Sequence, residues 1–175
     1  MIKNDVIDSI KSRRSIKKYI DKQISDEEIN TVLEAGTFAP TGRNRQSPVM
    51  VAIRDRDLVK RLSRMNADIL GSDSDPFYGA PCVIVVFADM SVSTGFEDAC
   101  LVMGNLMNAA HAIGVGSCWI HRAKEMFSCD EGKTLMREWG LSENYVGVGN
   151  CILGYMDGEM PAVRPRKENY VIRID

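Results

Sequence analysis

The chain has few of the side chains that support metal or nucleophilic chemistry. Its 175 residues include only two histidines, His111 and His121, and neither has a partner at the spacing of a metal site or a Cys/His nucleophile. The five cysteines are odd in number and contain no Cys-x-x-Cys pair, which argues against a disulfide framework and a zinc site. We therefore expect no metal and no catalytic dyad or triad.

Apolar residues surround four of the cysteines, Cys82, Cys100, Cys118 and Cys151. A free thiol in such surroundings behaves as a small buried hydrophobe, so we expect these four to pack in the core. Cys129 stands beside Asp130 and Glu131, which predicts greater exposure, and the nearby carboxylates disfavour its thiolate.

The chain also lacks a long uninterrupted apolar run. Its most apolar helical segment, about residues 95–113, contains Glu97, Asp98 and other polar residues and leaves no run of about 18 apolar residues. We expect this segment to be buried in a core or an oligomer interface rather than in a membrane. Residues 1–5 have no apolar signal region and no cleavage site, so a cytoplasmic location is expected.

Charge and composition weigh against a nucleic-acid partner. The formal net charge is −2 at pH 7, and aromatic residues make up 7% of the chain. A basic cluster is therefore a local feature of a slightly acidic protein. With 45% hydrophobic content and no linker, residues 1–175 are predicted to form a single domain.

Hydrophobic periodicity predicts an alternation of helices and strands. Apolar residues recur at helical spacing near residues 4–13, 25–36, 58–70, 95–113 and 130–139. Ser25 followed by Glu28 forms a capping box for the second of these helices. Apolar, β-branched runs predict strands at 49–53, 82–88, 117–120 and 146–155, of which 82–88 reads as buried on both faces. Residues 171–174 have the composition to close a further strand.

The most informative segment is the basic stretch, residues 11–19, Lys-Ser-Arg-Arg-Ser-Ile-Lys-Lys-Tyr. Guanidinium groups bind phosphate oxygens in bidentate fashion, and a serine hydroxyl adds a hydrogen bond. A second pair, Arg164 and Arg166, flanks a proline that stiffens the backbone between them. An isolated basic run is more often a solvated surface, so these residues alone leave both interpretations open.

Residues 38–48 form a loop without apolar periodicity, rich in amides and arginine and containing two prolines. A binding loop is one interpretation. The other is a solvated turn in which Asn44 hydrogen-bonds its own backbone. The glycines of segment 146–155 permit close approach of another backbone or of a ligand.

Five segments, in order along the chain, resemble the nitroreductase family of FMN-dependent oxidoreductases. They are residues 12–19, 39–46, Ala80-Pro81 before an apolar strand, 112–120, and Gly154-Tyr155 followed by Arg164-Pro165-Arg166. The resemblance implies an α+β fold in which helices cover a mostly antiparallel central sheet. It also implies a homodimer that binds two FMN molecules at the subunit interface.

The resemblance further assigns residues to the cofactor. It implies that the FMN phosphate is held by Arg13, Ser15, Arg164 and Arg166, with Arg14 nearby. Lys17 is placed close to the N1/O2 side of the flavin, where a cation favours the reduced state. The ring would be met by the side chains of Asn44 and Gln46 and by backbone at Trp119, Ile120 and His121. The backbone of Pro40, Thr41 and Gly42 would line the same cavity, partly from the other subunit.

The implied reaction is ping-pong transfer of reducing equivalents. NAD(P)H gives hydride to flavin N5, and a small oxidised acceptor such as a nitroaromatic or quinone then receives the electrons. No catalytic residue is expected from the protein itself. The alternatives are a flavin reductase, a reductive dehalogenase, a flavin-fragmenting enzyme or a non-catalytic FMN-binding module, with nucleic-acid binding the least favoured.

The sequence departs from the family pattern in two places. Many relatives have an insertion that forms a helical lid, whereas residues 62–81 leave little room for one. Some relatives also carry a basic residue near the flavin just before the middle strand, where this chain has Ser-Asp-Pro-Phe-Tyr at 74–78. Because of these two departures, the sequence does not identify the compound that accepts the electrons.

Overall fold

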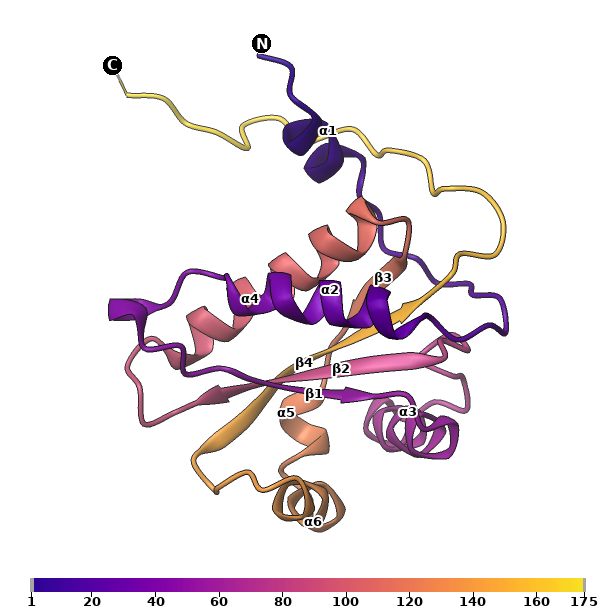
Figure 1. Ribbon diagram of the computed structural model, residues 1–175, viewed down its shortest axis with the longest axis vertical. Coiled ribbons are helices and arrows are strands. Elements are labelled where there is room, and N and C mark those ends of the chain that lie inside the picture. Colours follow the sequence, from indigo (N-terminus) through magenta and orange to yellow (C-terminus); the bar gives the residue numbers. More distant parts are fainter. Residues whose placement is uncertain (1, 175) are drawn as a thin grey trace.

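Strand β2 (Cys82–Asp89) runs through the middle of a four-stranded antiparallel sheet. It pairs with β1 (Val49–Ile53) on one side and with β4 (Tyr145–Gly154) on the other, and β3 (Gly116–Ile120) lies beyond β4. The computed structural model describes residues 2–174 and places the sheet between two layers of helices (Figure 1). The α+β fold with an antiparallel sheet is therefore confirmed.

One face of the sheet packs against three helices. They are α3 (Arg56–Leu70), the short α5 (Ala123–Met126) and α6 (Asp130–Glu138). Val83, Val85 and Phe87 of β2 point into this core. The ring of Phe87 meets the ring of Phe127 edge-on, with 4.8 Å between centroids.

The opposite face packs against α2 (Asp26–Thr37) and α4 (Gly95–Ala112). Ile84 and Val86 of β2 point into this second core. Because side chains alternate along a strand, every residue from 82 to 88 is buried on one face or the other. The strand predicted to be buried on both faces is confirmed.

The predicted elements agree with the structure to within two residues at each end. The first helix, α1 (Asp5–Ser12), begins after Asn4, whose side chain accepts a hydrogen bond from the Val6 N–H. The predicted capping box of Ser25 and Glu28 is present at the start of α2. Two short elements were not predicted, α5 and the 3-10 turn η1 (Gly42–Asn44).

The strand expected at residues 171–174 is wrong. After Asp157 the described chain contains no helix or strand, and it runs away from the sheet past α1 (Figure 1). Ile172 and Ile174 are 83% and 94% exposed. A strand needs a neighbouring strand to satisfy its backbone, and this segment has none among the described residues.

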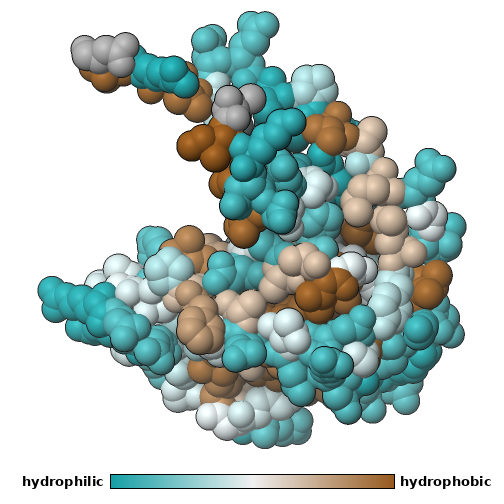
Figure 2. All heavy atoms as spheres, turned by 45° about the horizontal axis from the view of Figure 1, so that its top comes forward, coloured by the Kyte–Doolittle hydropathy of each residue, from teal (hydrophilic) through white to brown (hydrophobic). Residues whose placement is uncertain are grey.

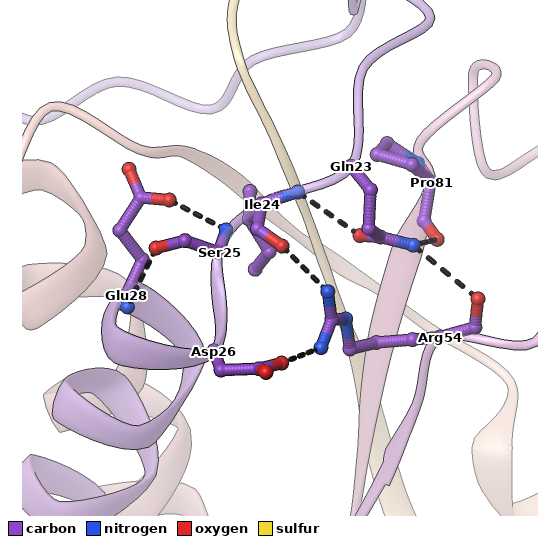
Figure 3. Close-up of polar contacts among 7 residues, drawn as sticks. All are labelled: Gln23, Ile24, Ser25, Asp26, Glu28, Arg54 and Pro81. Atoms are coloured by element: carbon purple, nitrogen blue, oxygen red, sulfur yellow. Dashed lines mark hydrogen bonds and ion pairs between the residues drawn. The ribbon is translucent and has the colours of Figure 1, made fainter.

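A network of polar contacts fixes the connection between α1 and α2 at one end of the sheet (Figure 3). The Gln23 side-chain amide donates to the carbonyls of Pro81, at 2.9 Å, and Arg54, at 3.3 Å. The Arg54 guanidinium donates to the Ile24 carbonyl at 2.9 Å and pairs with Asp26. The chain that follows the basic stretch is thereby held against β1 and β2.

Four of the five cysteines have the burial that their neighbours predict: Cys82, Cys118 and Cys151 are buried, and Cys129 is exposed. Cys100, also expected in the core, is only half-buried. Burial raises the pKa of the Cys82 thiol to about 12, so it stays protonated. None of the helices within residues 2–174 has the length and apolar character needed to cross a membrane.

Candidate functional site

The basic stretch leaves α1 as extended chain and pairs with the outer edge of β3. The Ile16 N–H donates to the Ser117 carbonyl at 3.0 Å. Ile16 and Tyr19 are buried and anchor the stretch, while Ser15 and Lys17 are exposed. The sheet edge thus presents the serine hydroxyl and the ammonium group outward.

Two arginines of this stretch contain buried nitrogen atoms that lack a hydrogen-bond partner. They are Nη1 of Arg13 and Nε of Arg14, and within residues 2–174 no acceptor reaches either atom. Another nitrogen of Arg14, Nη1, donates to the carbonyl of Lys11 at 2.8 Å. A buried charged donor without a partner costs free energy, so this arrangement fits an anion that supplies the missing acceptors.

The chain end brings a second pair of cations to the same place. A cavity of about 760 Å³ is lined by residues of the basic stretch and of the C-terminal segment, among them Arg14, Ser15, Lys17, Arg164 and Arg166. Two acids, Asp157 and Glu159, also line it, and Asp157 is paired with Lys18 at 2.7 Å. Five of the residues predicted for the cofactor therefore share one cavity.

His111 on α4 reports the electrostatics of this region. Its Nε2 lies 2.8 Å from the Ser12 hydroxyl. Burial, followed by repulsion from Arg13 and Arg14, lowers the pKa of His111 below its ordinary value of 6.5. The positive potential of the two arginines, which favours binding of an anion, therefore also disfavours protonation of His111.

The loop after α2 is strained and tightly bonded. Arg43, Asn44 and Gln46 have positive φ angles of 55°, 53° and 52°. The Gln46 N–H donates to the Thr41 hydroxyl at 3.1 Å, and the Gln46 side-chain amide donates to Asn44 Oδ1 at 3.1 Å. Such strain persists only where the surrounding contacts enforce it, and it is common at binding sites.

The loop and the basic stretch are not brought together within this chain. Turn η1 lies at the C-terminal end of α2, whereas the basic stretch approaches α2 from its other end (Figure 1). The 12 residues of α2 separate the two ends by about 18 Å. Asn44 and Gln46, together with exposed Pro40 and half-buried Thr41, form a group of their own.

The third predicted group continues along β3. Trp119 and Ile120 pair with Cys151 and Asn150 of β4. On the opposite edge of β3, the basic stretch pairs only at Ser117 and does not reach these two residues. His121 follows the strand and is exposed. This stretch of backbone therefore begins beside the cationic cavity.

Comparison with known proteins identifies the family. The nitroreductase family model matches residues 10–76 and 70–155. The chain belongs to the nitroreductase family. The match spans the basic stretch, the strained loop and all four strands.

Individual relatives agree with this membership. An Archaeoglobus fulgidus protein, provisionally named NADH dehydrogenase/NAD(P)H nitroreductase, is 33% identical over 156 residues, which cover 86% of this chain and 84% of the relative. A Vibrio harveyi NADPH-flavin oxidoreductase is 26% identical over 180 residues, covering 97% and 72%. The crystal structure of a Bacteroides fragilis nitroreductase with bound FMN has a TM-score of 0.90 at 25% identity, covering 99% of this chain and 100% of that chain.

Sequence reasoning missed two groups that shape the site of this nitroreductase-family protein. Asp98 of α4 is buried, and its carboxylate accepts hydrogen bonds from the Gly42 N–H and the Thr94 hydroxyl, both at 3.0 Å. Tyr78, in the loop before β2, faces Lys17. An acid in an apolar helix was an available signal for Asp98. Tyr78 lies in segment 74–78, which the sequence marked only for lacking the basic residue that some relatives carry there.

Proposed function

We propose that the protein is an FMN-dependent NAD(P)H oxidoreductase. A bound flavin would supply hydride chemistry at N5, so that reducing equivalents from NAD(P)H would pass in a ping-pong cycle to a small oxidised acceptor such as a nitroaromatic or quinone. The observation that carries the proposal is the cavity lined by Arg14, Arg164 and Arg166. In the same basic stretch, Nη1 of neighbouring Arg13 is buried without a hydrogen-bond partner among the described residues. The FMN that the solved B. fragilis relative holds supports the same cofactor.

The phosphate of FMN is assigned to the cationic cavity. Arg13, Ser15, Arg164 and Arg166 hold it, and Arg14 adds charge from the cavity wall. Arginine forks suit a phosphate better than lysine because they donate two parallel hydrogen bonds. The phosphate in turn supplies acceptors that Arg13 lacks in the chain by itself.

The remaining predicted residues are assigned to the ring. Lys17 stands at the N1/O2 edge, where its charge stabilises the negative charge that accumulates on reduction. Side-chain amides offer the donors and acceptors that match a pyrimidine edge. The ring contacts are therefore proposed for Asn44, Gln46, Trp119, Ile120 and His121, with the backbone at Pro40 and Thr41 lining the cavity.

The site is proposed to be completed by a second copy of the chain in a homodimer. The strained loop and the basic stretch lie at opposite ends of α2, so one protomer's loop meets the other's phosphate site. Hydrophobic side chains are exposed along both end segments, which project from the body (Figure 2). They include Val6 and Ile10 on α1, at 65% and 51%, and Val171 at 71%.

Helix α4 offers a test of that dimer. A Cβ placed at Gly104 meets nothing within 4 Å, and Leu101, on the same helix, is 47% exposed. If this face forms the dimer seam, Gly104→Leu produces monomers in analytical ultracentrifugation. Lys124→Leu, on α5 at the other face of the sheet, serves as the control and leaves the dimer intact. A dimer that survives Gly104→Leu assigns the seam to another surface.

The proposed cofactor is tested with the purified protein. Its absorbance spectrum is recorded with added FMN, and NADH or NADPH is then titrated anaerobically. We expect bound flavin that either nicotinamide reduces. Arg13→Ala or Arg164→Ala weakens FMN affinity by about tenfold or more, because charge-assisted hydrogen bonds are lost. Arg137→Ala, which changes an exposed arginine on α6, is the matched control. Unchanged affinity in both test variants overturns the phosphate assignment.

A flavin reductase is the second candidate for the reaction. The V. harveyi relative is named for that activity, and residues 62–81 leave little room for a lid over the ring. Steady-state oxidation of NADH and NADPH with nitroaromatic, quinone, halogenated and free-flavin acceptors distinguishes these activities from reductive dehalogenation. Bound flavin that no nicotinamide reduces supports a non-catalytic module instead. Five unpaired cysteines fit the reducing cytoplasm that we propose as the compartment.

A further inference from the structure

Tyr78 and Lys17 meet across the edge of the site. The Lys17 ammonium lies 5.6 Å from the centre of the Tyr78 ring, within the range of a cation–π interaction. Lys17 also lines the cavity that holds Ser15, Arg164 and Arg166. The tyrosine therefore touches the one lysine for which we propose a role at the flavin ring.

The backbone at Tyr78 is strained. Its φ angle is +54°, and Gly79 follows with φ +72°. A bulky residue rarely adopts this left-handed conformation, because its Cβ crowds the following carbonyl oxygen. An aromatic residue held there by its surroundings points to a function for the ring.

The surrounding loop enforces that conformation. The Asp75 carboxylate accepts hydrogen bonds from the Phe77 N–H at 2.9 Å and the Gly79 N–H at 2.6 Å, and it also bonds the buried hydroxyl of Ser63. The Tyr78 N–H donates to the Asp75 carbonyl at 3.1 Å. Phe77 is only 1% exposed and anchors the loop in the core. These hydrogen bonds and the buried Phe77 side chain fix the position of the Tyr78 backbone.

Lys17 and its neighbour Lys18 have different partners. Lys18 pairs with Asp157 at 2.7 Å. For Lys17, by contrast, the described residues provide no ion pair, and its neighbour is an aromatic face. A carboxylate in that place would neutralise the ammonium, whereas a ring face holds it and leaves its full charge available.

Building on the proposed FMN function, we propose that Tyr78 is a positioning residue that holds the Lys17 ammonium at the N1/O2 edge of the flavin. The ring acts through Lys17, and together they set how strongly the site favours reduced over oxidised flavin. Some relatives carry a basic residue in this segment. In this chain the segment instead provides Tyr78, whose ring orients Lys17.

The reduction potential of the bound flavin tests this. In Tyr78→Leu, Lys17 loses its fixed position, so the ratio of the FMN Kd values for the oxidised and reduced states falls about threefold. That change corresponds to a potential about 14 mV more negative for a two-electron couple. Tyr78→Phe keeps the ring face and retains the wild-type potential. Lys17→Met lowers the potential further, and adding Tyr78→Leu to it has no additional effect.

A second measurement uses the protein without flavin. The ring current of Tyr78 shifts the Lys17 ε-methylene proton resonance, which is identified by its loss in Lys17→Met. Tyr78→Leu moves this resonance toward the random-coil position, and Tyr78→Phe does not. Thermal unfolding of each variant shows that the fold is retained.

The outcomes separate the two proposals. If the wild-type protein binds FMN but Tyr78→Leu keeps the wild-type potential, or shifts it equally in the Lys17→Met background, the role of Tyr78 is overturned and the proposed function stands. If the wild-type protein binds no FMN, both are overturned. An unshifted Lys17 resonance in the wild-type protein also overturns the positioning role.

Discussion

The carboxylate of Asp98 on α4 accepts a hydrogen bond from the backbone N–H of Gly42, 3.0 Å away in the strained loop. The two residues are far apart in sequence, and this bond fastens the loop to a helix that packs on the sheet. Any side chain at position 42 would meet the Thr94 hydroxyl, since a Cβ there would lie 2.2 Å from Oγ1. Glycine at position 42 therefore avoids a clash with Thr94, and the Asp98 carboxylate supplies the acceptor for its N–H.

Asp98→Ala is expected to lower the free energy of unfolding by about 1–3 kcal/mol, because it leaves the Gly42 N–H and the Thr94 hydroxyl without their acceptor. Urea unfolding measures the loss. Asp98→Asn retains an oxygen for the Gly42 N–H and serves as the milder comparison. Equal stabilities of the alanine variant and the wild type would contradict the fastening role.

Gly149→Ala is expected to displace Trp119. A Cβ at position 149 would lie 2.5 Å from the indole Nε1 and 2.7 Å from Cε2, closer than atoms tolerate. Overpacking of this kind costs about 1–3 kcal/mol. Urea unfolding and the shift in tryptophan emission report it. An unchanged emission spectrum together with an unchanged free energy of unfolding would contradict this displacement.

The stability of the protein should fall in acid partly through Glu28. Hydrogen bonds from the Tyr155 hydroxyl, at 2.7 Å, and from the Ser25 backbone N–H lower the pKa of Glu28 below its ordinary 4.5. A carboxyl whose pKa is lower in the folded state stabilises the fold above pH 4.5, and this contribution disappears as the pH falls through the folded-state pKa. Tyr155→Phe is therefore less stable than the wild type in urea at pH 7, and the difference narrows at pH 3. A difference that is constant with pH would exclude this linkage.

Binding of FMN should raise the pKa of His111. Burial, followed by repulsion from Arg13 and Arg14, lowers the pKa of this histidine, and a bound phosphate dianion would offset the charge of the arginines. Proton NMR of the imidazole, titrated with and without FMN, measures the change. Arg13→Met is the control. Because this variant binds FMN more weakly, the same FMN concentration changes the pKa of His111 less than in the wild type. A pKa that stays fixed on binding would place the phosphate elsewhere.

Local signals in the sequence predicted most of the fold. Ser25 and Glu28 specify the start of α2 within four residues, and the run 82–88 specifies a central strand by its apolar composition alone. Residues 171–174 have a strand-like composition too, but a strand also needs a partner edge, and composition carries no information about one. Short α5 begins after Arg122, whose positive φ of 74° has no sequence signature.

The site was predictable only in part, for a physical reason. Arg13 and Arg164 could be proposed as partners because a family resemblance linked them, and the structure places the segments of both at one cavity. The contacts of Gly42 with Asp98 and of Lys17 with Tyr78 join residues far apart in the chain. Such pairs depend on how helices and loops pack, which neither periodicity nor spacing reveals.

The pairing of the basic stretch with β3 also covers part of a sheet edge through which chains could otherwise aggregate. An uncovered edge strand exposes unpaired N–H and C=O groups that can template pairing with another chain. The bond from the Ile16 N–H to the Ser117 carbonyl occupies part of that edge. The segment proposed to bind the cofactor thus also shields a strand edge from aggregation, so changes that detach it from β3 would reduce solubility as well as ligand affinity.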